Sequence, residues 1–152
     1  MLENLITSKT RIKLLIKFFI NISNEGYLNG LASEFNESTN SIRKELNNLS
    51  SVGYLKKKQI NNKILYSANK EHPMFSILQK VIMTHLGIED IIDRVMNQLG
   101  DVYKILLVGD YAKGIDSGII EIILVGKNLD KKYLETLKEK IEVIIKRKVN
   151  FL

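Results

Sequence analysis

Residues 39–47 carry hydroxyl, amide and cationic side chains that suit the edges of DNA base pairs. Arg43 can donate two hydrogen bonds to a guanine edge, and Asn40 or Asn47 can pair with an adenine edge. The remaining polar groups of the segment suit DNA phosphates. The candidate DNA-binding residues of this segment are Thr39, Asn40, Ser41, Arg43, Lys44 and Asn47.

A second polar cluster surrounds an Asn-Asn pair and supplies mainly lysines. Each lysine that neutralises a phosphate adds about 0.9 to the slope of log K against log salt concentration. A row of lysines can instead protect the edge of a strand from unwanted pairing. The candidate residues here are Lys56, Lys57, Lys58, Asn61, Asn62 and Lys63.

The net charge of +6 is unevenly distributed. Residues 1–70 contain 11 Lys and Arg against 5 Asp and Glu, whereas residues 71–152 contain 12 of each. A basic half beside a neutral half points to a polyanionic partner for the first half. Double-stranded DNA is therefore the expected partner.

Composition excludes several other kinds of site. The 152 residues include no Cys and only two His, so we expect no disulfide, no thiolate chemistry, no metal and no cofactor. The apolar stretch Leu14–Ile20 is broken by Lys17 and is shorter than the ~18–20 residues of a membrane span. Because Arg11 and Lys13 also interrupt any signal-peptide pattern, we expect a soluble cytoplasmic protein without a membrane partner.

Hydrophobic spacing predicts the elements that position the polar residues. Helices are expected over 8–22, 27–35 and from Ser38 or Thr39 to about residue 50, with Ser8 as the first N-cap. Strands 54–60 and 63–66 flank the Asn-Asn pair, and Asn tolerates the positive φ of a two-residue turn. Three helices followed by a hairpin indicate a winged helix-turn-helix, whose third helix enters the major groove.

The second half alternates helices and strands. Pro73 begins a helix to about residue 86, and a second amphipathic segment covers 88–99. A strand over 102–108, a Gly-rich loop over 109–118, a strand over 119–125, a helix capped by Asp130 and a final strand over 149–152 follow. The expected fold class is α+β: a winged helix-turn-helix over 1–70, a helical linker that forms a homodimer over 71–100, and a small α/β domain over 101–152.

Several short motifs resemble the ArsR/MarR-like winged-helix regulators. They are Leu31-Ala32, Ile42-Arg43-Lys44-Glu45-Leu46, Leu49, Gly53-Tyr54-Leu55, Tyr66 and Asn69. The following His72-Pro73-Met74-Phe75 resembles the joint of a bacterial and archaeal family that fuses such a winged helix to a minimal nucleotidyltransferase domain. The resemblance implies a transcription regulator with a nucleotidyltransferase-like second domain.

The second domain departs from the family's catalytic pattern. Gly109, Ala112, Gly114 and Gly126 match its frame, but Asp110 replaces the Ser that contacts the triphosphate. Ile119 stands at the first metal carboxylate, Glu121 keeps the second, and Asn150 corresponds to the third. The resemblance therefore implies no catalytic residue and a vestigial nucleotide site. That site comprises Gly109, Asp110, Lys113 and Glu121.

Two other functions remain as alternatives. A nucleotidyltransferase enzyme would require Asp110 or Asp116 from the loop to join Glu121 in holding a metal ion. An antitoxin-like protein-interaction module would bind a protein partner through the neutral C-terminal domain. In the preferred interpretation, this domain serves dimerisation, partner contact or sensing in a regulator.

Overall fold

Three helices begin at the capping residues expected from the sequence, in a computed structural model that describes residues 2–152. The Ser8 side chain accepts a hydrogen bond from the Arg11 N–H at 3.1 Å, and Ser38 accepts one from the Ser41 N–H at 3.2 Å. Asp130 caps its helix in the same way. Short polar side chains satisfy first-turn N–H groups that lack partners within a helix.

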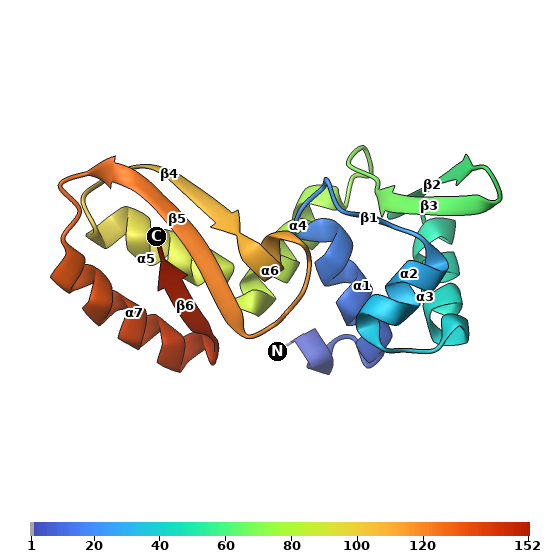
Figure 1. Cartoon of the computed structure of the whole chain (residues 1–152), viewed down its shortest axis with the longest axis horizontal. Coiled ribbons are helices and arrows are strands. Elements are labelled where there is room, and N and C mark those ends of the chain that lie inside the picture. Colours follow the sequence, from blue (N-terminus) through green and yellow to red (C-terminus); the bar gives the residue numbers. More distant parts are fainter. Residues whose placement is uncertain (1) are drawn as a thin grey trace. The chain divides into compact units, whose positions relative to one another are not determined.

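The chain divides into two units, of which the first ends at Ile82 and the second begins at Met83 (Figure 1). The first unit contains the sheet β1-β3-β2, in which both pairs are antiparallel. This order of elements is the one expected of a winged helix-turn-helix. Its elements are η1 (Leu2–Asn4), α1 (Lys9–Phe19), β1 (Glu25–Gly26), α2 (Leu28–Phe35), α3 (Thr39–Ser51), β2 (Leu55–Ile60) and β3 (Lys63–Ala68).

The core of the first unit fixes one face of α3. Ile42 and Leu46 of this helix are fully buried, as are Leu14 and Phe18 of α1. Glu45 lies on the same buried face, where its carboxylate accepts hydrogen bonds from Arg11 Nε at 2.7 Å and Ser8 Oγ at 3.2 Å. This packing leaves the opposite face of α3 in solvent.

The hairpin turn is confirmed, whereas one strand was missed. Ile60 pairs with Lys63, so Asn61-Asn62 forms the two-residue turn, and Asn61 has a φ of 55°. Glu25 and Gly26 lie between the first two helices expected from the sequence. They form β1, which pairs with β3. Two residues are too few to show the alternation that identifies a strand.

The second unit contains the sheet β4-β5-β6, with α5 and α7 covering one face (Figure 1). β4 pairs antiparallel with β5, and β6 pairs parallel with β5 within the chain. Ile120, Ile122 and Val149 are buried on the covered face. The boundary between the units falls within α4. The elements are α4 (Phe75–Leu86), α5 (Ile88–Gln98), β4 (Asp101–Val108), α6 (Gly109–Ala112), β5 (Ile119–Lys127), α7 (Lys131–Ile145) and β6 (Lys148–Phe151).

Two details of the second unit differ from the expectation. The segment expected to be a Gly-rich loop begins with the short helix α6. The helix over 88–98, expected in a linker, packs against β4 and α7 because Ile91 and Val95 bury their side chains completely. No helix among residues 2–152 has the length and apolar character needed to span a membrane.

Candidate nucleic-acid interface

The exposed face of α3 carries all six candidate residues of the helix. Thr39, Asn40, Ser41, Arg43, Lys44 and Asn47 are each exposed to solvent. Arg43 Nη1 donates a hydrogen bond to Asn40 Oδ1 at 2.9 Å. The two side chains with the strongest potential to recognise bases therefore lie next to each other.

The lysines of the hairpin do not form one patch. Side chains alternate between the two faces of a strand, and Lys57 shares a face with its cross-strand partner Tyr66. Lys56 and Lys58 lie on the opposite face, where Lys56 Nζ forms an ion pair with Glu71 at 2.9 Å. This contact lowers the pKa of the Glu71 carboxyl, through the hydrogen bond first and the charge second. Of the three lysines, Lys57 is therefore the one on the Tyr66 side of the hairpin.

A cleft of about 510 Å³ separates the hairpin from α2 and α3. It brings Arg43 and Asn47 of α3 together with Asn62 and Lys63 of the hairpin. Asn61 lines a smaller adjoining hollow of about 330 Å³. The residues that line the cleft are Tyr27, Leu28, Asn29, Gly30, Arg43, Asn47, Asn62, Lys63, Ile64 and Tyr66.

The cleft is electrostatically suited to an anion. Its lining includes the cations of Arg43 and Lys63, and none of the residues 2–152 that line it is acidic. Lys63 Nζ lies 5.6 Å from the centre of the Tyr27 ring, a cation–π contact that holds the ammonium group at the cleft. Burial raises the pKa of the Tyr66 hydroxyl, and the nearby Arg43 charge opposes that rise. A phosphodiester strand running beside α3 would meet both cations.

The sequence analysis did not identify Tyr27, the first turn of α2 or Tyr66 as parts of this site. They come from separate segments that only the fold brings together. One local signal was available, because Tyr27 occupies the N-cap of α2, where Ser, Thr, Asp or Asn is usual. Its side chain makes no capping hydrogen bond, and Leu28, Asn29 and Gly30 of the first turn of α2 line the cleft.

In the second unit, the three positions that the sequence resemblance compared with metal carboxylates lie on one sheet face. Glu121 is the register partner of Asn150, and Ile119 precedes Glu121 by two residues on β5. Gly109 has a φ of 71°, and a Cβ there would overlap Glu121 Oε2, so the carboxylate lies against the glycine. Only one of the three side chains is a carboxylate. Within residues 2–152, no three His, Cys, Asp or Glu side chains form a group that could hold a metal ion.

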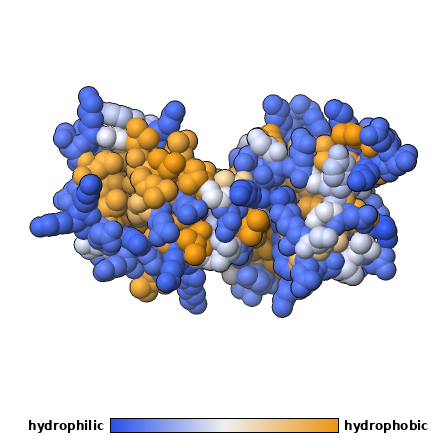
Figure 2. All heavy atoms as spheres, in the orientation of Figure 1, coloured by the Kyte–Doolittle hydropathy of each residue, from blue (hydrophilic) through white to orange (hydrophobic). Residues whose placement is uncertain are grey.

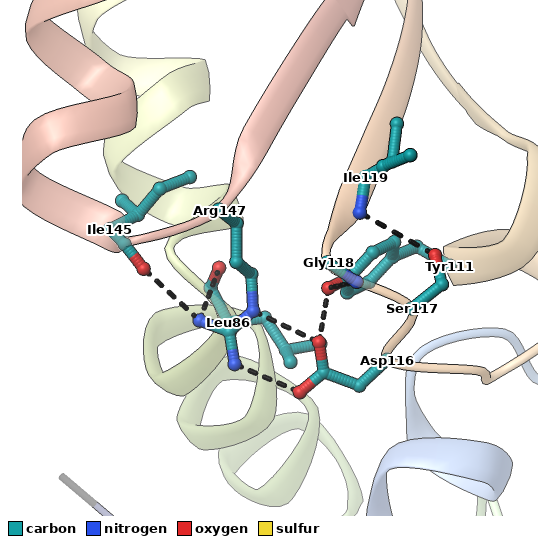
Figure 3. Close-up of polar contacts among 8 residues, drawn as sticks. All are labelled: Leu86, Tyr111, Asp116, Ser117, Gly118, Ile119, Ile145 and Arg147. Carbon is teal, nitrogen blue, oxygen red and sulfur yellow. Dashed lines mark hydrogen bonds and ion pairs between the residues drawn. The ribbon is translucent and has the colours of Figure 1, made fainter.

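The loop carboxylates do not complete this set. Asp110 lies on α6 and Lys113 directly follows it, and both residues are exposed. Asp116 instead accepts hydrogen bonds from Arg147 Nε at 3.0 Å and Nη2 at 2.9 Å, and another from the Tyr111 hydroxyl (Figure 3). Gly118 N–H donates to the same hydroxyl at 3.0 Å. The network ties the loop to the turn before β6.

The charges of this network favour an ionised Asp116 and a neutral Tyr111. Burial acts to raise the pKa of Asp116, but the hydrogen bonds from Arg147 and Tyr111 lower it below its usual value. Burial, followed by the hydrogen bond to Asp116, raises the pKa of Tyr111 to about 12. The arrangement explains the loop's position without a ligand.

Comparison with known proteins gives few matches. No family model matches the chain. No curated protein matches it either. Among solved structures, the chain is similar to reduced HlyU from Vibrio cholerae N16961, at 15% sequence identity and a TM-score of 0.41, over 64% of this chain and 86% of that chain.

Proposed function

We propose that the protein is a DNA-binding transcription regulator. The basic cleft between α3 and the hairpin supports this proposal most directly, since it joins exposed amide and cationic side chains and no acidic residue within 2–152 lines it. The excess positive charge of residues 1–70 acts in the same direction. Double-stranded DNA is the proposed partner.

The proposed roles follow from the position of each side chain. α3 enters the major groove, where Arg43, Asn40 and Asn47 contact base edges. Thr39, Ser41 and Lys44 contact the adjacent backbone. The cleft receives one phosphodiester strand, held by Lys63 and the backbone N–H groups of α2. Lys57, Lys58, Asn61 and Asn62 contact phosphates from the hairpin, whereas Lys56 must first release Glu71.

The nucleotidyltransferase-like second unit is proposed to be non-catalytic. The positions of residues 119, 121 and 150 support this view, because they offer a single carboxylate. Asp116, which could have compensated, is held by Arg147 and Tyr111. The unit would then serve contact with other protein chains.

Fluorescence anisotropy tests DNA binding. The purified protein is titrated into a labelled duplex from its own upstream region and into a scrambled duplex, at three salt concentrations. We expect tighter binding to the native duplex, steep weakening with salt, and a loss of at least about tenfold in affinity for Arg43→Ala/Lys44→Ala. The charge-matched control Lys131→Ala/Lys140→Ala should bind like the wild type.

Two results would contradict the proposal. Equal and weak binding to both duplexes would show that the protein does not recognise a DNA sequence, as the proposed regulator must. Mg²⁺-dependent incorporation of a labelled nucleotide that is lost in Glu121→Gln would instead establish the nucleotidyltransferase activity that the single carboxylate argues against.

A further inference from the structure

The sheet of the second unit has an apolar face that no element of that unit covers. This open face is formed by the side chains of β4, β5 and β6 that point away from α5 and α7. Figure 2 shows hydrophobic atoms gathered over this sheet. Leu106, Ile119 and Val125 are 41%, 45% and 43% exposed on it. Val108 and Ile123 lie between them and are half-buried.

The sequence of β5 is that of a strand covered on both faces. A sheet with one face in water usually alternates apolar and polar residues. Ile120, Ile122 and Leu124 face the helices, yet Ile119, Ile123 and Val125 on the other face are also apolar. Burying such a patch against another surface is favourable in proportion to its area. The pattern therefore indicates that the open face contacts a protein surface.

Charged residues near the two ends of the open face indicate which protein surface could cover it. Lys104 pairs across the strands with Val125, and Glu121 pairs with Val108. The row formed by Leu106 and Ile123 separates Lys104 from Glu121. A two-fold axis that crosses the strands at this row would bring Lys104 of one copy toward Glu121 of the other. Lys148 and Asn150 lie toward the Glu121 end.

We propose that the open face binds the same face of a second copy of this chain. The apolar rows would stack, and Lys104 of each copy would approach Glu121 of the other, as a self-complementary interface requires. This surface differs from the helices of residues 71–100, the dimer element expected from the sequence. The proposal does not depend on DNA binding, because association can be measured without DNA.

The size of the face sets the expected strength. β4 and β5 are eight and nine residues long and β6 is four residues long. With strands about 4.8 Å apart, they give a surface of roughly 340 Å² per copy. The total of about 700 Å² lies below the roughly 1,200–2,000 Å² of stable specific interfaces, so the contact is a weak one and the dimer should dissociate on dilution.

Sedimentation velocity from about 1 to about 200 μM tests the proposal without DNA. The wild type should shift from monomer to dimer across this range. Leu106→Glu should raise the dimer dissociation constant at least about tenfold. Val143→Glu is the matched control, because Val143 is an apolar residue on α7 with 79% exposure. Circular dichroism would show that both variants are folded.

Two further variants keep the test independent of folding defects. Lys104→Glu should weaken the dimer, whereas Lys131→Glu on α7 should not. Because the chain has no cysteine, Leu106→Cys introduces a single thiol. A maleimide cross-linker about 10 Å long should join two copies of this variant across stacked sheets, but should not join Val143→Cys.

Three outcomes would overturn the proposal. A wild-type monomer at every concentration would exclude a second copy and leave the face to a different protein. A dimer unaffected by Leu106→Glu would place the interface elsewhere, as would a dimer lost in Val143→Glu. A protein that dimerises but does not bind DNA would contradict only the proposed function. A protein that binds DNA but does not dimerise would contradict only this proposal.

Discussion

Asp116 accepts hydrogen bonds from Arg147 and Tyr111, so its negative charge is balanced inside the second unit. The same carboxylate, considered only by its place in the loop, was a candidate metal ligand. Its partners come from 5 and 31 residues along the chain. These partners give Asp116 a structural role, which is to connect the loop to the turn before β6.

The pH dependence of stability should report this carboxylate. Because the folded state lowers the pKa of Asp116, its contribution is present above the unfolded value of 3.8 and is lost as pH falls through the folded value. Asp116→Asn should destabilise the protein by about 1–2 kcal/mol at pH 7. The difference from wild type should shrink below about pH 4 in urea unfolding experiments. Asp110→Asn, at an exposed position, should change little.

Glu45 is the buried charged residue of the first unit's core, at 5% exposure. Arg11→Met would leave its carboxylate with Ser8 as its remaining hydrogen-bond donor. We expect a loss of about 2–3 kcal/mol in the free energy of unfolding. Lys56→Met removes the exposed ion pair with Glu71 and should lower the free energy of unfolding much less, because solvent screens this pair. Equal effects of the two changes in thermal or urea unfolding would refute this role for Glu45.

At the scale of elements, α2 and α3 line one side of the cleft and the hairpin lines the other. Gly30 lies in the first turn of α2, and a Cβ there would meet no atom within 4 Å. Glycine within a helix is less favourable than alanine by about 0.8–1.0 kcal/mol. A side chain at position 30 can therefore be accommodated in the protein without DNA. In the proposed complex, the same side chain would point toward the DNA.

Substitutions at Gly30 separate stability from DNA binding. Gly30→Ala should raise the free energy of unfolding by about 0.5–1 kcal/mol. Gly30→Glu should lower DNA affinity about tenfold through charge repulsion, while Gly30→Gln, of similar size, should lower it less. Thermal unfolding and anisotropy measure the two effects. Full DNA affinity in Gly30→Glu would show that DNA does not approach this cleft.

At the scale of the whole molecule, positive charge is concentrated in the part of the chain that contains the cleft. The salt dependence of DNA binding should show which lysines take part. Lys57→Ala/Lys63→Ala should reduce the slope of log K against log salt by about 1.8. Lys131→Ala/Lys140→Ala changes the net charge equally and should leave the slope unchanged. Equal reductions would mean that binding responds to total charge alone.

The sequence alone was sufficient for features that depend on neighbouring residues. Ser8, Ser38 and Asp130 begin helices because each side chain accepts a hydrogen bond from its own first turn. Asn61 forms the hairpin turn because it tolerates positive φ. The apolar runs of β4 and β5 likewise predicted strands. These preferences act within a few residues, so they can be recognised before the chain is folded.

Only the tertiary structure decided which distant side chains meet. The cleft combines Tyr27, Arg43, Lys63 and Tyr66 from three elements or their ends. Strand register divided the three adjacent lysines between two faces and gave Lys56 to Glu71. The sequence determined these side chains and their local conformations. Their partners were set by long-range packing and strand pairing, which no local pattern specifies.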